Sequence, residues 1–170
     1  MTFFSGFGFA NESELFCDRL PSGAFSAAGF SLGAIKAFEF ALSAQTRVDH
    51  LTLLSPAFFQ DKDEKFKRLQ LIGFAKNDEE YMRNFYELCG QCDTRFYDPN
   101  PQRSDLELLL NYRWEIEKFN ALKGVKITAL IGGDDRIVNA EAAREFFLKC
   151  NCEVLFIKNA DHLLGYKEKK

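Results

Sequence analysis

The stretch Gly29-Phe30-Ser31-Leu32-Gly33 decides how this chain folds. Residues 23–30 form an apolar segment typical of a buried strand, and residues 32–45 carry apolar side chains at helical spacing. A serine flanked by glycines between a strand and a helix is typical of a sharp, strained turn, because small neighbours let the chain bend without a clash. The helix then directs its N-terminal N–H groups at the serine, where they favour negative charge. The stretch therefore predicts a turn that presents Ser31 as a nucleophile.

Strands and helices continue to alternate on both sides of this turn. The apolar run at residues 50–54 does not alternate with polar residues, which is typical of a parallel strand covered on both faces. Asn11-Glu12-Ser13-Glu14 has the chemistry of a capping box at the start of a helix. We expect the other elements to be strands at residues 2–5, 125–131 and 153–157 and helices at residues 11–20 and 139–150. The sequence predicts the α/β class, with a mostly parallel sheet and helices on both faces.

A helical insert interrupts this alternation. Residues 60–125 predict three helices at positions 62–74, 77–89 and 104–122, the last opened by the capping box Ser104-Asp105-Leu106-Glu107. The length of 170 residues fits one domain with a sizeable core. We therefore predict a single domain over residues 1–170, in which residues 60–125 form a helical cap.

Composition limits the partners and the compartment. The net charge of −3 argues against nucleic acid or an anionic membrane as the main partner. No apolar run approaches the roughly 20 residues that a membrane helix needs. The apolar start of the chain has no Lys or Arg ahead of it, so we expect no signal peptide and a cytoplasmic protein. The chain contains 19 phenylalanines, which can fill a core or line an apolar ligand site.

The five cysteines fit a reducing compartment, because they form an odd set without the spacing of a small disulfide scaffold. Cys89-Gly90-Gln91-Cys92 is a CxxC motif, but it follows a predicted helix, whereas a thioredoxin-like pair would end a strand and open a helix. No second CxxC and no nearby histidine completes a zinc site. We expect incidental reduced thiols in preference to a redox pair, and neither a metal nor a cofactor.

A serine nucleophile needs a base, and the chain offers only two histidines. In hydrolases whose nucleophile lies on this kind of turn, the acid and then the histidine follow the serine, and the histidine lies on a loop after the last strand. His162 meets this requirement, whereas His50 begins a predicted strand. We therefore predict that His162 is the base.

The acid should follow the preceding strand, where the glycine turn at residues 132–138 offers Asp134 and Asp135. For the oxyanion hole, one N–H group should come from the residue after the nucleophile, Leu32, and another from the loop after the first strand. Phe7, in the glycine-rich segment 5–8, is the candidate for that second donor. The position of the turn does not decide whether Asp134 or Asp135 is the acid.

Four segments together resemble the α/β-hydrolase esterases that act on pimelyl-acyl carrier protein methyl ester in biotin biosynthesis: residues 5–8, 29–33, 132–138 and 161–164. The opening residues 3–9, the run 33–37 and residues 66–71 are more closely similar to the short form of this esterase in Helicobacter-type bacteria. The resemblance favours Asp135 as the acid, because Gly132 to Val138 matches the family turn Gly-x-x-Asp-x-x-Val. It also implies a reduced sheet of five or six strands. Ser5 differs from the family, whose larger members usually carry histidine there.

The resemblance implies hydrolysis of the methyl ester that masks the far carboxylate of pimelyl-acyl carrier protein. It also implies that basic residues of the insert contact the acidic carrier protein, and the nearest equivalents are Lys65, Lys67, Arg68 and Arg113. Acidic neighbours at positions 61, 63 and 64 make an ordinary solvated helix face an equal alternative. Two other functions stay open: an acyl hydrolase or thioesterase for another small acyl substrate, and an interaction protein with this fold but no turnover.

Overall fold

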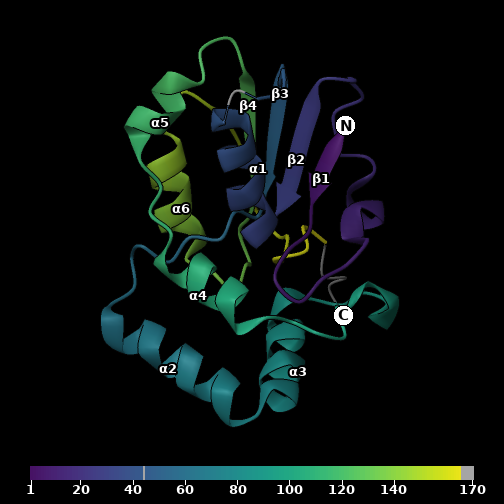
Figure 1. The fold of residues 1–170 in the computed structure, drawn as a ribbon, viewed down its shortest axis with the longest axis vertical. Helices are drawn as coiled ribbons and strands as arrows, with labels where there is room; N and C mark the ends of the chain where they lie inside the picture. Colours follow the sequence, from purple (N-terminus) through teal and green to yellow (C-terminus); the bar gives the residue numbers. More distant parts are fainter. Residues whose placement is uncertain (44, 166–170) are drawn as a thin grey trace.

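The structure is a computed structural model that describes residues 1–43 and 45–165. In this part of the chain a parallel sheet has the strand order β1-β2-β3-β4-β5. Figure 1 shows β1, β2 and β3 side by side, with their carboxyl ends toward the same side of the molecule. The strands are β1 (Thr2–Phe4), β2 (Ser26–Phe30), β3 (His50–Leu54), β4 (Lys126–Gly132) and β5 (Glu153–Ile157).

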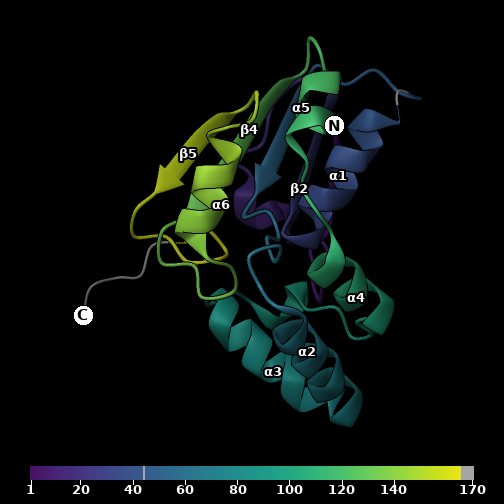
Figure 2. The same cartoon turned by 90° about the vertical axis from the view of Figure 1, so that its left-hand side faces the viewer.

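Helices cover both faces of the sheet. α1 (Leu32–Leu42) follows β2, α5 (Ile116–Ala121) precedes β4, and α6 (Ala140–Phe147) connects β4 with β5, as Figure 2 shows from the side. Their apolar side chains form one core cluster with alternate strand residues such as Leu51 and Leu53. Leu54, which follows Leu53, belongs to a second cluster with Phe16, from the short 3-10 helix η1 (Glu12–Phe16). The predicted α/β architecture is confirmed.

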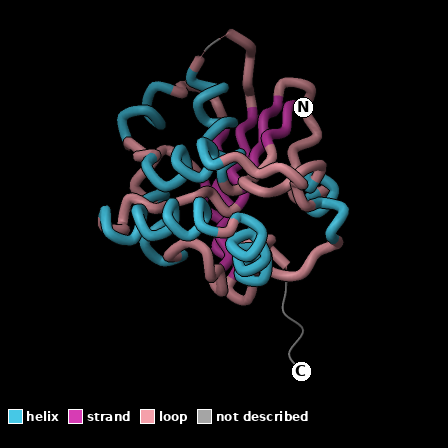
Figure 3. The backbone as a smooth tube through the Cα atoms, turned by 60° about the horizontal axis from the view of Figure 1, so that its bottom comes forward, coloured by secondary structure: helices cyan, strands magenta, loops and turns pink. Residues whose placement is uncertain are grey.

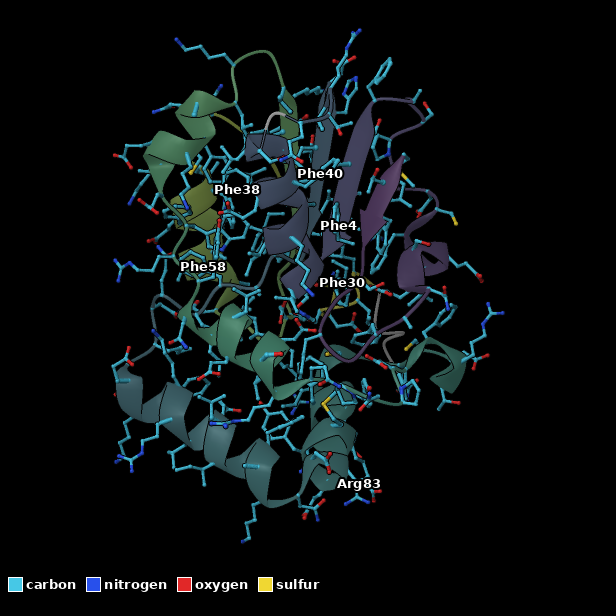
Figure 4. All side chains as sticks on the ribbon, in the orientation of Figure 1. Phe4, Phe30, Phe38, Phe40, Phe58 and Arg83 are labelled. Carbon is cyan, nitrogen blue, oxygen red and sulfur yellow. The ribbon has the colours of Figure 1, made fainter. Side chains whose placement is uncertain are left out.

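Aromatic rings hold the first cluster together. The ring of Phe38 in α1 is tilted against Phe119 of α5 at 4.4 Å and meets Trp114 edge-on at 5.2 Å. Phe4 of β1 lies 5.4 Å from Phe40 of α1. Figure 4 labels Phe4, Phe38 and Phe40 around α1. Full burial of one such ring stabilises the fold by about 1.5–3 kcal/mol. The high phenylalanine content therefore serves the core of the sheet layer.

A group of helices lies beyond the carboxyl ends of the strands. It consists of α2 (Glu64–Lys76), α3 (Asp78–Cys89), the short 3-10 helix η2 (Thr94–Phe96) and α4 (Arg103–Asn111), and we call it the cap. Side chains of Asp63 and Asn77 accept hydrogen bonds from Phe66 and Glu80 N–H groups, and so start α2 and α3. Figure 3, seen from this side, shows the cap helices in front of the strands.

Three local expectations are wrong. The helix expected at residues 11–20 is only the 3-10 helix η1, because Asn11 adopts φ 60° and caps nothing. The helix expected at 104–122 is two helices, α4 and α5, separated by a segment that buries Trp114. Ser104 does not cap α4, whose N-cap residue is Gln102 without a side-chain hydrogen bond. None of the helices described in residues 1–43 and 45–165 has the length and apolarity to cross a membrane.

Candidate active site

Ser31 lies on a strained turn between β2 and α1. Its φ is 53°, an uncommon value for a residue with a side chain, and its N–H group donates to Leu54 O at 2.9 Å. The flanking glycines are required by close packing: a Cβ on Gly29 would lie 1.9 Å from Gly33 O, and one on Gly33 would lie 1.9 Å from Phe4 O. The turn therefore fixes Ser31 Oγ above the carboxyl end of the sheet, and the side chain is almost completely buried.

His162 connects Ser31 with Asp135. Its Nε2 atom lies 3.1 Å from Ser31 Oγ, and its Nδ1 atom lies 2.6 Å from Asp135 Oδ2. When Nδ1–H donates to the ionised carboxylate, Nε2 remains as an acceptor for the serine proton. The side chains of His162 and Asp135 are fully buried, so water does not compete for these contacts.

The structure separates the two candidate acids. Asp135 Oδ1 accepts hydrogen bonds from the N–H groups of Ile137, at 2.7 Å, and Val138, at 3.1 Å, while its other oxygen faces His162. Asp134 is exposed, and its N–H group donates to Ala160 O at 2.9 Å. His50 is also exposed, at the amino end of β3, whereas Ser31 follows the carboxyl end of β2. The geometry joins Ser31, His162 and Asp135 and excludes the other two from contact.

The two residues predicted for the oxyanion hole have N–H groups without an acceptor in the described part of the chain. Phe7 and Leu32 are each 1% exposed, and neither N–H group donates a hydrogen bond to another described residue. Buried backbone donors are almost always paired in folded proteins, so an unpaired one needs an explanation. An oxyanion that forms next to Ser31 would supply the missing acceptor.

Two buried carboxyls near the site were not found by sequence reasoning. Asp161 Oδ1 accepts from the N–H groups of Leu163, at 3.0 Å, and Gly165, at 3.1 Å, and thereby shapes the turn that carries His162. Glu12 accepts from Gly6 N–H at 2.7 Å in the segment that carries Phe7. Asp161 could have been found from its place next to His162, but Glu12 was interpreted as part of a helix cap.

Helix α3 contacts both loops of the site. Phe85 packs edge-on against Phe7 at 5.4 Å, and Tyr86 Oη donates to Gly8 O at 2.6 Å. At the end of the helix, Cys89 O accepts from Leu163 N–H at 3.3 Å. One cap helix thus holds the loop with the oxyanion donor and the loop with the histidine.

A cavity of about 520 Å³ adjoins this arrangement. It includes Ile137 and Val138, which bond Asp135, and Phe85, which packs on Phe7. Its other apolar walls come from the cap, and Lys62 and Arg136 add two cations. A larger cavity of about 950 Å³ lies along α3 near residues 97–101. Ser31, His162 and Asp135 line neither of these two cavities. We assign the smaller cavity to the substrate because its walls include Ile137 and Val138, whose N–H groups bond the acid, and Phe85, which packs on Phe7.

The cysteines are reduced and poorly suited to thiolate chemistry. All five are free. Burial raises the pKa of Cys89 well above its usual value, with a further contribution from Asp135, and burial also raises the pKa of Cys92. Among the described residues no group of histidine, cysteine, aspartate and glutamate side chains could hold a metal ion.

The basic residues predicted for carrier contact differ in their surroundings. Lys65 and Arg68 are exposed on α2, on the same side as the exposed Leu69 and Ile72. The ammonium group of Lys67 instead binds Glu64 at 3.1 Å, and only 13% of its side chain is exposed. Arg113 is exposed in the connection between α4 and α5.

Solved structures of esterases share this arrangement of elements. The chain resembles an esterase from Exiguobacterium antarcticum with a TM-score of 0.66 at 14% identity, over 81% of this chain and 59% of the esterase. It resembles naproxen esterase from Bacillus subtilis with a TM-score of 0.53 at 22% identity, over 82% of this chain and 53% of the other. A lipase-esterase related protein from Clostridium acetobutylicum gives a TM-score of 0.66 at 15% identity, over 96% and 86% of the two chains.

The chain has the α/β-hydrolase fold. It spans little more than half the length of the first two of these structures. The sequence matches no protein-family model and no curated protein sequence. Within this α/β-hydrolase fold, Ser31 follows β2, Asp135 follows β4 and His162 follows β5. Because the strands are parallel, these three positions meet at one edge of the sheet.

Proposed function

We propose that this chain is a serine carboxylesterase. The observation that carries the proposal is the continuous contact of Ser31, His162 and Asp135, together with the buried N–H groups of Phe7 and Leu32, which have no acceptor within residues 1–43 and 45–165. A hydroxyl nucleophile, a base held in one tautomer and unpaired donors for an oxyanion are the parts that acyl transfer requires. The esterase names of the structural neighbours support the same reaction class.

In the proposed reaction, His162 Nε2 takes the Ser31 proton as Oγ attacks the ester carbonyl. The carbonyl oxygen becomes an oxyanion and accepts hydrogen bonds from Phe7 and Leu32 N–H. The tetrahedral intermediate collapses, and the leaving alkoxide receives the proton from His162 and departs as an alcohol. Water then attacks the acyl-serine with the same proton transfers, and the free acid leaves. Asp135 keeps Nδ1 protonated and stabilises the imidazolium in both steps.

We propose that the substrate is the methyl ester of pimelyl-acyl carrier protein, which would release methanol and place the chain in biotin biosynthesis. Support comes from the sequence resemblance to the short esterase of this pathway, BioV, and from the apolar cavity beside the site. Burial of an acyl chain in this cavity would contribute affinity in proportion to the apolar area removed from water. The carrier protein is acidic, so its contact should fall on the exposed cations Lys65 and Arg68 of α2.

A panel of substrates tests the proposal. We expect wild type to hydrolyse methyl pimelyl-acyl carrier protein, and Ser31→Ala to lose this activity by at least about 10³-fold. Mass spectrometry of the carrier protein distinguishes loss of the methyl group from cleavage of the thioester. Thioester cleavage, or faster turnover of another acyl group, would assign the chain to a different acyl hydrolase. Absence of turnover with every ester, at equal levels for wild type and Ser31→Ala, would leave an interaction protein with this fold.

A further inference from the structure

The loop that carries the Phe7 N–H group is glycine-rich and needs support from outside. Gly6 and Gly8 flank Phe7, and glycine has the widest backbone freedom of any residue. Within the loop one hydrogen bond closes a tight turn, from Phe9 N–H to Gly6 O at 3.1 Å. Because C=O and N–H of a trans peptide point in opposite directions, this bond turns Phe7 N–H away from Phe9. The direction of the donor thus depends on how Gly6 is held.

Glu12 holds Gly6 from the side of η1. Its side chain is 0% exposed, and Oε1 accepts the Gly6 N–H group at 2.7 Å, a short charge-assisted distance. Oε2 is buried and makes no hydrogen bond of standard geometry with a described residue, although the Ser5 side chain and the Glu12 N–H group lie near enough to this carboxyl to lower its pKa. A carboxyl buried in this way is costly, and burial accordingly raises the pKa of Glu12. An apolar residue would fill this place at a lower cost if packing were its only role.

The opposite end of the loop is held from the cap. Gly8 O accepts from Tyr86 Oη at 2.6 Å and from Asp98 N–H at 2.8 Å. Both ends of the segment are therefore tied by hydrogen bonds, while the N–H group of Phe7 between them bonds none of the residues that the structure describes.

We propose that Glu12 is a positioning residue of the active site, which fixes the oxyanion loop through Gly6 N–H so that Phe7 N–H points at the oxyanion. The proposal rests on the esterase function proposed above. Glu12 touches neither the substrate nor Ser31 in this scheme and acts through the loop alone. Its contribution appears only when negative charge develops on the carbonyl oxygen, so it belongs to kcat and not to substrate binding.

The test compares Glu12→Leu with Glu12→Gln on p-nitrophenyl butyrate, a small ester that involves no carrier protein. Leucine removes the acceptor, and we expect kcat to fall about 10- to 100-fold with KM within about 3-fold, somewhat less than the loss of an oxyanion donor itself. Glutamine keeps an oxygen that can accept from Gly6 N–H, so it should restore kcat to within about 3-fold of wild type. A boronic acid that forms a tetrahedral adduct with Ser31 should bind Glu12→Leu more weakly by the factor lost from kcat.

Ile127→Ala is the matched control. Ile127 is buried in β4 near its amino end, away from the site, so this variant loses stability through a cavity and should keep the kcat of wild type. If Glu12→Leu does not fold, Glu12→Asp replaces it in the test. The aspartate carboxyl is one methylene shorter and cannot reach the Gly6 N–H group. Wild-type kcat and boronate affinity in the leucine or aspartate variant would overturn the positioning role alone. A wild type that neither hydrolyses esters nor binds the boronate would overturn both proposals.

Discussion

The neighbouring carboxyls of the turn after β4 differ in what surrounds them. Asp135 is buried between two backbone N–H groups and the His162 ring, whereas the carboxyl of Asp134 is open to solvent. Only the buried carboxylate can determine which nitrogen of His162 carries the proton. The family turn favoured the same residue, but spacing alone left both available.

We predict that Asp135→Asn lowers kcat for ester hydrolysis by about 10³- to 10⁴-fold, because an amide can hold the imidazole in the wrong tautomer. Asp134→Asn is the matched control and should stay within about 2-fold, since an exposed side chain rarely contributes more. Steady-state kinetics of both variants on one ester decide between them. A large loss in Asp134→Asn with little in Asp135→Asn would reverse the assignment.

The sequence predicts site residues that belong to a recognisable motif or to a residue type with few copies in the chain. Ser31 has a motif, and His162 had a single competitor. Glu12 had neither, because its function depends on a contact with Gly6 that crosses from η1 to the loop after β1. Asn11 and Glu14 look like a helix cap in sequence, yet Glu12 turns inward and Glu14 pairs with Arg95 at 2.8 Å. Tertiary contacts of this kind override a local pattern.

At the scale of elements, the turn after β2 depends on how closely β1 approaches α1. A Cβ on Gly33 would lie 1.9 Å from Phe4 O, which is backbone and cannot rotate away. The oxyanion loop begins directly after Phe4, so any shift of β1 is transmitted to it.

We predict that Gly33→Ala lowers the free energy of unfolding by about 3 kcal/mol or more, since overpacking against backbone forces a strand to move. Gly73→Ala in α2 offers a contrast, because its Cβ would meet the ring of Tyr81 in α3 at 3.4 Å, an ordinary van der Waals distance. Alanine in a helix is favoured over glycine by about 0.5–1 kcal/mol, so this variant should be neutral or slightly more stable. Urea unfolding of both proteins measures the difference, and equal stabilities would contradict the close approach.

Helices α2 and α3 are joined by a hydrogen bond that responds to pH. Tyr81 Oη donates to Gln70 Oε1 at 2.9 Å, and burial raises the pKa of Tyr81 to about 12. A folded-state pKa above the unfolded value of about 10 means that the phenol stabilises the fold below pH 10. This contribution is lost as the pH rises from 10 toward 12.

We therefore predict that Tyr81→Phe is less stable than wild type by about 1 kcal/mol at pH 8, the worth of one hydrogen bond. The gap should close as the pH rises above 10 and then reverse, to about 1 kcal/mol in favour of Tyr81→Phe near pH 12, because the wild type loses up to about 2 kcal/mol, allowing for partial exposure of the ring. Urea unfolding at pH 8, 10 and 11.5 measures it. A gap that stays constant across this range would show that Tyr81 is not shielded from ionisation.

The break between α4 and α5 shows why element boundaries escaped the sequence. Residues 104–122 carry a continuous helical pattern, but Trp114 is buried, with Nε1 donating to Ala57 O at 2.9 Å and its N–H group to Gln60 Oε1 at 2.8 Å. Both acceptors lie in the connection that leads from β3 to the cap. Because the indole is anchored there, the chain is not helical between α4 and α5. No local sequence pattern predicts this break, since the acceptors lie more than fifty residues away in the chain.

For the molecule as a whole, net charge opposes binding to an acidic carrier protein, so attraction has to come from a local group of cations. A chain with a net charge of −3 repels an acidic protein at long range, but this repulsion is screened beyond about 8 Å at physiological salt. The exposed side of α2 combines the cations Lys65 and Arg68 with Leu69 and Ile72, which are 55% and 50% exposed. Such a surface offers both charge attraction and apolar burial to a docking helix.

We predict that the double variant Lys65→Glu/Arg68→Glu raises KM for methyl pimelyl-acyl carrier protein by about 10-fold or more, in line with the loss of steering by two charge reversals. Hydrolysis of p-nitrophenyl butyrate should be unchanged, because that ester has no carrier to dock. Lys123→Glu/Lys149→Glu makes the same change in net charge at exposed residues near the amino ends of the strands and should leave both activities intact. If both double variants raise KM equally, net charge and not the surface of α2 governs the encounter, and the proposed carrier contact on the cap is wrong.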